Sequence, residues 1–381
     1  MTEVEQQFAE QFGFTDGLET YFCPGRVNLI GEHIDYLGGL VLPCAISLGI
    51  TAVCRPNSSK EVRLVSTDFE GIDSFTLDDL PNAKQNHWTD FVVGVMLDLQ
   101  HQGIEIEGCD ILFSSTLPKA SGLSSSAALE VLCYFLFHHI ATGKEPNRVQ
   151  MALDCQKIEN EFIGVACGIM DQFAVANGKA NHAISLDCNS LEHDFVPIDL
   201  GAYSLLIINS NKPRTLAESA YNQRRQECNE ALEIIANSRP IENLVNAKNE
   251  DLSLLGGNLL KRTRHAASEH QRVQDSAIAL SKNQIKKFGQ LMTESHHSLR
   301  EDFEVSCDEL DFIVDFSNQT DGCLGARMTG AGFGGCCIAL IETRQSNHFQ
   351  KQLQEFYLQR FGFAPSVYLA SPSSGVHKLP F

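Results

Sequence analysis

No stretch of this sequence approaches the ~20 consecutive apolar residues that a membrane-spanning helix needs. Basic residues are scarce: 29 Lys and Arg stand against 48 Asp and Glu, giving a formal net charge of −19. Because surfaces that bind nucleic acids are basic, this balance argues against such a role. The first residues, MTEVEQQFAEQF, lack the basic start and apolar core of a secretory signal. We therefore expect a cytoplasmic protein that binds neither membranes nor nucleic acids.

Paired cysteine motifs are also missing, although the chain has 13 cysteines. None forms a C-x-x-C pair with the spacing of zinc ligands, and an odd number of scattered thiols suits a reducing compartment. Each cysteine is expected to act as a small buried apolar residue. The adjacent histidines at 138–139 and 296–297 point away from each other on a helix, so the sequence predicts no histidine metal site.

The length of the chain and its 43% of apolar residues suit two domains with sizeable cores. Alternating β-branched residues predict strands, and apolar residues at helical spacing predict helices. The predicted strands cover residues 49–55, 61–66, 109–113, 182–187, 204–208, 325–329, 335–341 and 366–370. The predicted helices cover residues 88–100, 123–140, 148–162, 170–175, 216–236, 261–282 and 343–361. Because these elements interleave without a strict βαβ rhythm, we predict an α+β fold with domains at residues 1–200 and 201–381.

One segment predicts a phosphate site. Residues 118–128 read PKASGLSSSAA, so small residues lead directly into a helix. The first N–H groups of a helix have no partner within it and lie at the positive end of its dipole, where they can accept phosphate. Three serines add hydroxyl groups, one of which could ligate Mg²⁺. The segment matches neither G-x-x-x-x-G-K-[ST] nor G-x-G-x-x-G, and a helix merely capped by serine is the alternative.

Two further segments concentrate polar groups and glycines. Residues 25–36 read GRVNLIGEHIDY and gather an arginine, two carboxylates and an imidazole. Carboxylate and imidazole groups hydrogen-bond sugar hydroxyls, and arginine steadies phosphoryl charge, although a surface loop is the alternative. Residues 325–335 read GARMTGAGFGG. So many glycines imply positive φ angles or close backbone approach to another group, and a tight connection between strands is the alternative.

Together these three segments resemble the three signatures of the GHMP kinase family, in the family's order. Residues 25–36 also match the signature of galactokinases, G-R-x-N-[LIV]-I-G-E-H-x-D-Y, at every fixed position. Further similar stretches are CGIMDQ at 167–172, NSN at 209–211, and Tyr221 ahead of Arg224 and Arg225. The resemblance implies a ribosomal-protein-S5-like N-terminal domain and a ferredoxin-like C-terminal domain. It also implies a monomeric enzyme that transfers the γ-phosphate of ATP, with Mg²⁺, to the anomeric hydroxyl of galactose.

The resemblance assigns roles to particular residues. It implies that Asp171 accepts the proton of the anomeric hydroxyl, and that Arg26 keeps this carboxylate ionised and stabilises the transferred group. Sugar contacts are implied for Glu32, His33, Asp35, Gly168 and Tyr221. ATP contacts are implied for Ser66, Ala120, Ser121, Gly122, Leu123, Ser124, Ser125 and Ser126. The implied Mg²⁺ ligands are Ser126 and Glu159.

The sequence departs from the family pattern at a few positions. Ala120 stands where the phosphate motif usually has glycine, so we expect altered nucleotide contact if this position needs a positive φ. Ile34 replaces a threonine common in galactokinases and Leu37 the usual asparagine, and isoleucine at the former position also occurs in N-acetylgalactosamine kinases. An N-acetylgalactosamine kinase and a non-enzymatic sensor of galactose and ATP therefore stay open as alternatives. The presence of residues 123–128, Arg26 and Asp171 favours an enzyme.

Overall fold

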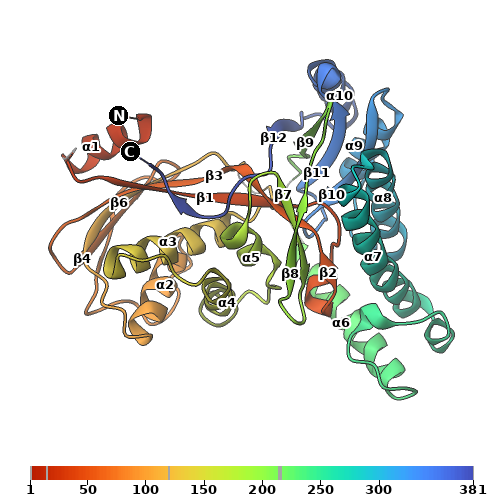
Figure 1. Ribbon diagram of the computed structural model, residues 1–381, viewed down its shortest axis with the longest axis horizontal. Coiled ribbons are helices and arrows are strands. Elements are labelled where there is room, and N and C mark those ends of the chain that lie inside the picture. The colour runs from red at the N-terminus through yellow and green to blue at the C-terminus, as the bar shows by residue number, and fades with distance from the viewer. Residues whose placement is uncertain (1, 14–15, 119–120, 213–216, 381) are drawn as a thin grey trace.

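A computed structural model describes residues 2–13, 16–118, 121–212 and 217–380 (Figure 1). The helices are α1 (Glu3–Phe12), α2 (Asp90–His101), α3 (Ser125–Thr142), α4 (Arg148–Ile158), α5 (Met170–Asn177), α6 (Ala217–Ala236), α7 (Gly257–Ser281), α8 (Ile285–Ser298), α9 (Asp308–Gln319) and α10 (Ser346–Phe361). The strands are β1 (Glu19–Asn28), β2 (Leu40–Val41), β3 (Pro43–Pro56), β4 (Glu61–Ser66), β5 (Asp73–Thr76), β6 (Cys109–Ser115), β7 (His182–Asp187), β8 (His193–Pro197), β9 (Tyr203–Asn209), β10 (Cys323–Thr329), β11 (Cys336–Glu342), β12 (Ser366–Ala370) and β13 (His377–Lys378). Short 3₁₀ turns are η1 (Asp35–Leu37), η3 (Leu244–Asn246), η4 (Asp251–Leu254) and η6 (Thr343–Gln345), and π-helical turns are η2 (Glu159–Ile163) and η5 (Leu299–Phe303).

The first domain is built on a six-stranded sheet in the order β13-β1-β3-β6-β4-β5, in which β4 and β6 pair in parallel. Helices α2 to α5 cover one face of this sheet, and α1 lies on the other (Figure 1). Successive side chains of a strand point to opposite faces. Accordingly Ala52 and Cys54 of β3 join the main core, whereas Val53 packs with Phe8 and Phe12 of α1. A separate three-stranded sheet, β2-β7-β8, completes this half.

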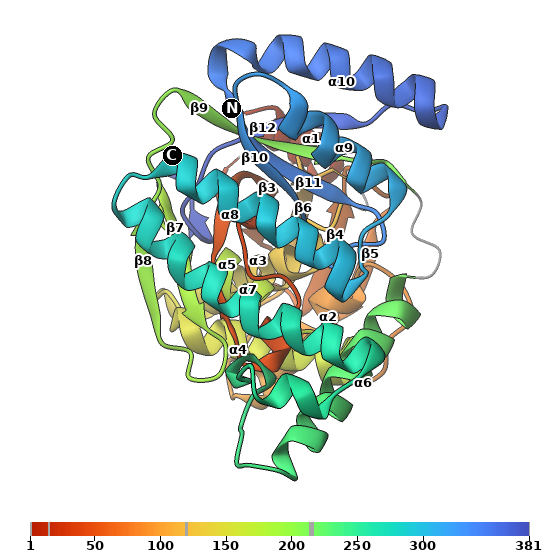
Figure 2. The same cartoon turned by 90° about the vertical axis from the view of Figure 1, so that its right-hand side faces the viewer.

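The second domain has a four-stranded antiparallel sheet in the order β10-β11-β9-β12. Helices α8 and α9 lie against β10, and α7 runs beside α8 (Figure 2). The core strand β11 is buried along nearly its whole length, from Cys336 to Ile341. Within the described ranges, no helix is both long and apolar enough to cross a lipid bilayer.

The predicted α+β class is confirmed, and the structure corrects the detail of several predicted elements. The strands predicted at 61–66, 182–187 and 366–370 are β4, β7 and β12. The helix predicted at 148–162 is not continuous, because α4 ends at Ile158 and η2 follows with the wider hydrogen bonding of a π-helix. Such turns often occur at functional sites. The polar segment at 25–36, for which a surface loop was the alternative, begins as the buried end of β1.

The chain passes between the two domains twice. β8 ends at Pro197 in the first domain, and β9 begins at Tyr203 in the second. After β12 the chain returns to the first domain, where β13 pairs with β1 and the Leu379 N–H donates to the Thr20 carbonyl at 2.8 Å. The predicted boundary near residue 200 lies between β8 and β9, and it stays a prediction.

Candidate active site

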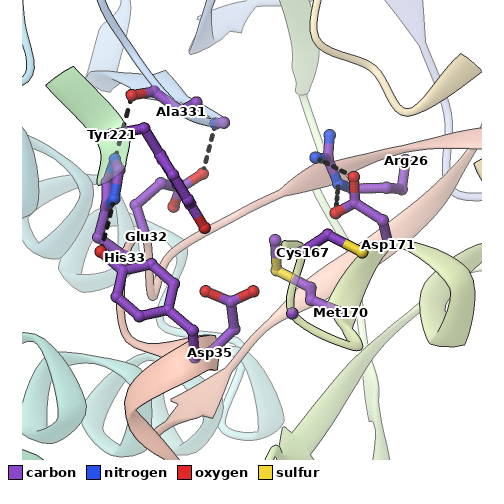
Figure 3. Close-up of a pocket in the computed structure, with 12 residues that line it drawn as sticks. Arg26, Glu32, His33, Asp35, Cys167, Met170, Asp171, Tyr221 and Ala331 are labelled. Atoms are coloured by element: carbon purple, nitrogen blue, oxygen red, sulfur yellow. Dashed lines mark hydrogen bonds and ion pairs between the residues drawn. The ribbon is translucent and has the colours of Figure 1, made fainter. Parts of the chain in front are cut away.

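A small cavity of about 120 Å³ lies where the two domains meet (Figure 3). Its walls come from the end of β1, the segment that follows it, the start of α5, α6, and the turn after β10. The lining residues are Arg26, Glu32, His33, Asp35, Tyr36, Cys167, Gly168, Met170, Asp171, Tyr221, Gly330 and Ala331. Every residue predicted to be catalytic or to contact the sugar therefore lies in this one cavity.

Arg26 and Asp171 form a two-pronged ion pair on one wall. The Arg26 Nε donates to Oδ1 of Asp171 at 2.8 Å, and its Nη2 donates to Oδ2 at 2.9 Å. The third nitrogen, Nη1, donates to the Gly122 carbonyl at 2.8 Å, and the Ser124 hydroxyl also donates to Oδ2 of Asp171. The Arg26 side chain is 6% exposed, whereas that of Asp171 is 30% exposed. The carboxylate is thus held firmly while it stays open to the cavity.

Asp35 presents a second carboxylate to the cavity (Figure 3). Burial, with the nearby negative charge of Asp171, raises the pKa of Asp35 to about 6. The backbone of Gly168 packs directly against this side chain, because a Cβ placed on Gly168 would overlap Oδ2 of Asp35. A side chain at this position would displace the Asp35 carboxylate, and Gly168 contributes only peptide backbone to the cavity wall.

His33 connects the segment at residues 25–36 with the segment at residues 325–335. Its Nε2 lies 3.1 Å from the carbonyl of Ala331, and since a carbonyl only accepts, Nε2 carries the hydrogen. Nδ1 therefore accepts from the Tyr36 hydroxyl at 3.0 Å. Burial lowers the pKa of His33 to about 3, which keeps the ring neutral. Both ring nitrogens have protein partners, and sugar contact by His33 remains a prediction.

Glu32 is saturated with hydrogen bonds from both domains. Its side chain accepts from Nδ2 of Asn28 at 2.8 Å and forms an ion pair with Nη2 of Arg327 at 2.6 Å. It also accepts from the Thr329 hydroxyl at 3.0 Å and the Gly330 N–H at 2.8 Å. Burial raises the pKa of Glu32, and the Arg327 charge opposes this effect. Glu32 thus fastens the end of β1 to the end of β10, through an arginine to which the sequence assigned no role.

Glu269 on α7 supports the same segment from behind. It accepts from the Gly31 N–H at 2.9 Å and from the Ser295 hydroxyl at 2.6 Å. Gly31 has φ +106°, a conformation that favours glycine. Arg272 pairs with Glu269 at 2.8 Å, and this charge helps to lower the pKa of Glu269 to about 2 against the opposing effect of burial. The second domain therefore shapes the polar segment of the first.

Tyr221 on α6 points its hydroxyl into the cavity, on the side where Asp35 lies (Figure 3). Its ring packs against His33 at 5.4 Å and Tyr36 at 5.5 Å between centroids. Burial and the charge of Asp35 raise the pKa of Tyr221. The phenol therefore stays protonated and can donate a hydrogen bond to a ligand.

A second, larger cavity of about 470 Å³ lies in the first domain beside the start of α3. Its lining residues are Ile50, Ser66, Asp68, Phe69, Trp88, Phe91, Phe113, Ser115, Leu117, Pro118, Ser125, Ser126 and Leu129. The rings of Phe69 and Trp88 stack with 5.7 Å between centroids and 5° between planes. Flat apolar walls with a few hydroxyl groups suit a planar heterocycle. The predicted ATP residues Ser66, Ser125 and Ser126 all lie here.

The other predicted ATP residues are placed differently. Ala120 lies outside the described residues. Ser121, Gly122, Leu123 and Ser124 are absent from the described lining of both cavities. Gly122 and Leu123 offer their carbonyls to Arg26, and Ser124 donates to Asp171. Residues 122–124 therefore support the ion pair between Arg26 and Asp171 at the first cavity.

The two predicted Mg²⁺ ligands lie side by side. The Ser126 hydroxyl donates to Oε1 of Glu159 at 3.1 Å, and Nε2 of Gln172 donates to the other carboxylate oxygen. Burial and the charge of Asp171 raise the pKa of Glu159 to about 7, and a bound cation would offset that penalty. Two hard oxygen donors near the start of the helix predicted to bind phosphate fit Mg²⁺, which takes its remaining ligands from phosphates and water. The described residues include no cluster of three or more His, Cys, Asp or Glu able to hold a metal alone.

Several lining residues carried no predicted role. In the first cavity these are Tyr36, Cys167, Met170, Gly330 and Ala331. All of them lie inside or beside the motifs, so their position was a usable signal. In the second cavity, Trp88 is the only tryptophan of the chain, and aromatic residues from separate elements join it. No local spacing connects these residues, so sequence reasoning had no signal for them.

Comparison with known proteins gives three family matches along the chain. The galactokinase galactose-binding signature matches residues 6–56. The N-terminal domain of GHMP kinases matches residues 90–179, and their C-terminal domain matches residues 276–359. The first match contains the polar segment at 25–36, and the second contains both Asp171 and the start of α3.

Similar individual proteins cover the whole chain. Galactokinase of Clostridium tetani is 41% identical over 384 residues, covering 100% of this chain and 98% of that protein. Galactokinase of Bacillus subtilis is 39% identical over 389 residues. A crystal structure of Lactococcus lactis galactokinase complexed with galactose superimposes with a TM-score of 0.93 at 41% identity, covering 98% of each chain. Methanococcus jannaschii mevalonate kinase, at 21% identity and a TM-score of 0.67, shares the fold.

Proposed function

This chain belongs to the galactokinases of the GHMP kinase family, and we propose that its reaction takes place in the cavity between the domains with Asp171 as general base. The predicted family, two-domain GHMP fold and ATP-dependent sugar kinase activity are confirmed. The reaction moves the γ-phosphate of ATP to the anomeric hydroxyl of galactose and yields galactose 1-phosphate and ADP. The observation that carries the site assignment is the Arg26–Asp171 pair, whose carboxylate opens into a cavity lined by the sugar-binding motif.

The chemistry requires a positioned base more than a strong one. As the anomeric oxygen attacks the γ-phosphorus, the bond from phosphorus to the β–γ bridging oxygen breaks and ADP leaves. The hydroxyl proton passes to Asp171. General-base assistance of this kind is worth roughly 10²–10⁴-fold, and positioning supplies much of the remainder. Arg26 stabilises both the carboxylate and the charge that develops on the transferred group.

Sugar selection is proposed to rest on hydroxyl contacts. Asp35 can accept, Tyr221 can donate, and the backbone at Gly168 brings the cavity wall close to the ligand. A site built around such contacts rejects a sugar whose hydroxyl is misplaced, because buried polar groups are left unpaired. Glucose differs from galactose at the 4-hydroxyl alone, so we expect it to be a very poor substrate.

The second cavity is proposed to hold the nucleotide base, with the phosphates at the start of α3. When bound there, Mg²⁺ would neutralise phosphate charge, and Ser126 and Glu159 would hold it. We expect Glu159→Gln to raise the Mg²⁺ concentration needed for half activity more than the KM for galactose, because a hard cation prefers a charged oxygen. An unchanged Mg²⁺ titration would contradict this ligand assignment.

Trp88→Ala tests the proposed site of the nucleotide base. This substitution should raise the KM for ATP while the KM for galactose stays the same.

We also propose a domain boundary near residue 200, a monomeric state and a cytoplasmic location. The change of sheet between β8 and β9 supports the boundary. Each of the 13 cysteines lies in the described ranges and is a free thiol, which suits a reducing compartment. Light scattering behind a sizing column tests the monomer, and a mass near twice 42.1 kDa would contradict it.

A side-by-side sugar panel tests the function most directly. The measurement is kcat/KM for galactose, 2-deoxygalactose, galactosamine, N-acetylgalactosamine and glucose, with ADP release as the readout. Galactose should exceed all others. A tenfold preference for N-acetylgalactosamine would favour that alternative, and sugar binding without ADP release would favour a sensor.

A further inference from the structure

Ser124 adopts an unusual conformation immediately before α3. Its φ of +62° and ψ of +48° lie in the left-handed region, which is unfavourable for a residue with a Cβ. The side chain does not cap α3, although serine at this position commonly does so. Instead, the hydroxyl of this nearly buried residue reaches across to α5 and donates to Oδ2 of Asp171.

The turn that contains Ser124 is bonded to the ion pair at two other points. The backbone N–H of Arg26 donates to the Leu123 carbonyl at 3.2 Å, and Nη1 of Arg26 donates to the Gly122 carbonyl at 2.8 Å. Residues 122–124 therefore form one hydrogen-bonded unit with Arg26 and Asp171. The next two residues, Ser125 and Ser126, instead line the second cavity, which is proposed to hold the nucleotide.

The hydrogen bonds distinguish the two carboxylate oxygens of Asp171. Oδ2 accepts from Nη2 of Arg26 and from Ser124, so both of its lone pairs are in use. Within the described part of the chain, Oδ1 accepts one hydrogen bond, from Nε of Arg26. A lone pair of Oδ1 is left for a proton from the substrate.

We propose that Ser124 is a positioning residue of the catalytic base and not a phosphate ligand, and that by occupying Oδ2 it makes Oδ1 the atom that accepts the anomeric proton. This inference rests on the proposed role of Asp171. It replaces the ATP contact that the resemblance implied for Ser124. It also connects the two cavities, since one turn carries the support of the base and the hydroxyls that face the nucleotide.

The test uses Ser124→Ala and Ser124→Gly in the full chain. Hydrogen bonds to charged groups are worth about 1.5–3 kcal/mol, so each variant should lower kcat by roughly tenfold or more. The KM for ATP and the Kd for ADP, measured by calorimetry, should change by no more than about twofold. If ADP affinity and the KM for ATP weaken tenfold while kcat is kept, Ser124 is a phosphate ligand and the inference is wrong.

Comparing these two variants separates the hydroxyl from the backbone shape. Glycine adopts a positive φ without strain, so Ser124→Gly keeps the turn and removes only the hydroxyl. The inference requires both variants to lose kcat alike. A glycine variant with wild-type kcat would overturn the inference, because the conformation alone would then be sufficient. Ser317→Ala is the matched control: it removes a buried hydroxyl that donates to the Ile313 carbonyl within α9, and kcat should not change.

A double-mutant cycle distinguishes failure of the inference from failure of the proposed function. If Ser124 acts through Asp171, Ser124→Gly should have little further effect in an Asp171→Asn background. A further tenfold loss in that background would mean that Ser124 acts elsewhere. Near-wild-type activity of Asp171→Asn alone would instead refute the base role on which the inference depends.

Discussion

Two arginine–carboxylate pairs border the cavity between the domains, and their carboxylates differ in exposure and in hydrogen bonding. Arg26 holds Asp171 with both prongs, yet the aspartate side chain remains 30% exposed and has an oxygen lone pair open to the cavity. Arg327 contacts Glu32 at 2.6 Å, but Glu32 is 2% exposed and takes three further hydrogen bonds. The charges are the same in both pairs, and only the first includes a carboxylate oxygen that accepts a single hydrogen bond within the described residues.

Under the proposed mechanism, unfilled hydrogen-bonding capacity, rather than charge, distinguishes the carboxylate that accepts the proton. A buried ion pair can fix the relative position of two domains, because breaking it leaves an unpaired charge in the interior. A held but unsaturated carboxylate can accept a proton. This contrast leads to tests that affect one pair and leave the other intact.

The largest effect should come from Asp171→Asn. The substitution keeps the shape and removes the base, so kcat should fall about 100-fold or more while the thermal midpoint stays near that of the wild type. Steady-state kinetics and a melting curve on the same preparation check this. A variant with near-wild-type kcat would place the base elsewhere.

The next largest effect should come from Arg26→Ala. This substitution should lower kcat by roughly 100-fold, because removing one hydrogen-bond donor to a developing charge commonly lowers kcat by that factor. Arg26→Lys should recover only part of the loss, since lysine lacks the planar fork that grips both oxygens. Full recovery with lysine would show that the arginine supplies charge alone.

Arg327→Met tests the other pair and should raise the KM for galactose by about tenfold with a smaller change in kcat, because Glu32 loses its support. It should also lower the free energy of unfolding by about 3–5 kcal/mol, and Arg327→Lys is the milder variant if the first does not fold. The matched control is Arg262→Met. Arg262 is equally buried and pairs with Glu227 at 2.6 Å, outside the cavity. Its loss should destabilise the protein without changing the KM for galactose, and an equal KM effect would mean that general loosening explains both.

The smallest expected effect is a change in the thermal stability of the protein when Asp35 is substituted. Burial raises the pKa of Asp35 to about 6, so between pH 4 and 6 the folded state binds more protons than the unfolded state at this group. The stability contributed here is therefore present at low pH and lost as pH rises through about 6. Asp35→Asn should raise the thermal midpoint at pH 7.5 by roughly 2–4 °C while it weakens galactose binding. A lower midpoint at pH 7.5 would contradict this.

Sequence reasoning reached the residues of the first cavity because they cluster in short motifs. It located β4, β7 and β12 correctly because their alternation is local. It did not detect the contact between Arg327 and Glu32, which joins the segment at residues 325–335 to the distant segment at residues 25–36. It assigned Ser124 to the nucleotide together with its neighbouring serines, and the different role proposed above depends on a tertiary contact, the hydrogen bond from Ser124 to Asp171. The position of a motif is readable from sequence, but the direction of each side chain depends on tertiary packing.

The return of the chain to β13 has a consequence for the order of folding. The strand that pairs with the outer edge of β1 is synthesised after the whole second domain. Domains generally fold as units during synthesis, N-terminal first, but here the first sheet cannot gain its outer strand until its neighbour has been made. During that interval β1 presents an unpaired edge, which other chains can join. Premature termination between β12 and β13 would leave the edge at Tyr21 and Phe22 unpaired, so the late pairing of β13 also protects the protein against association with other chains.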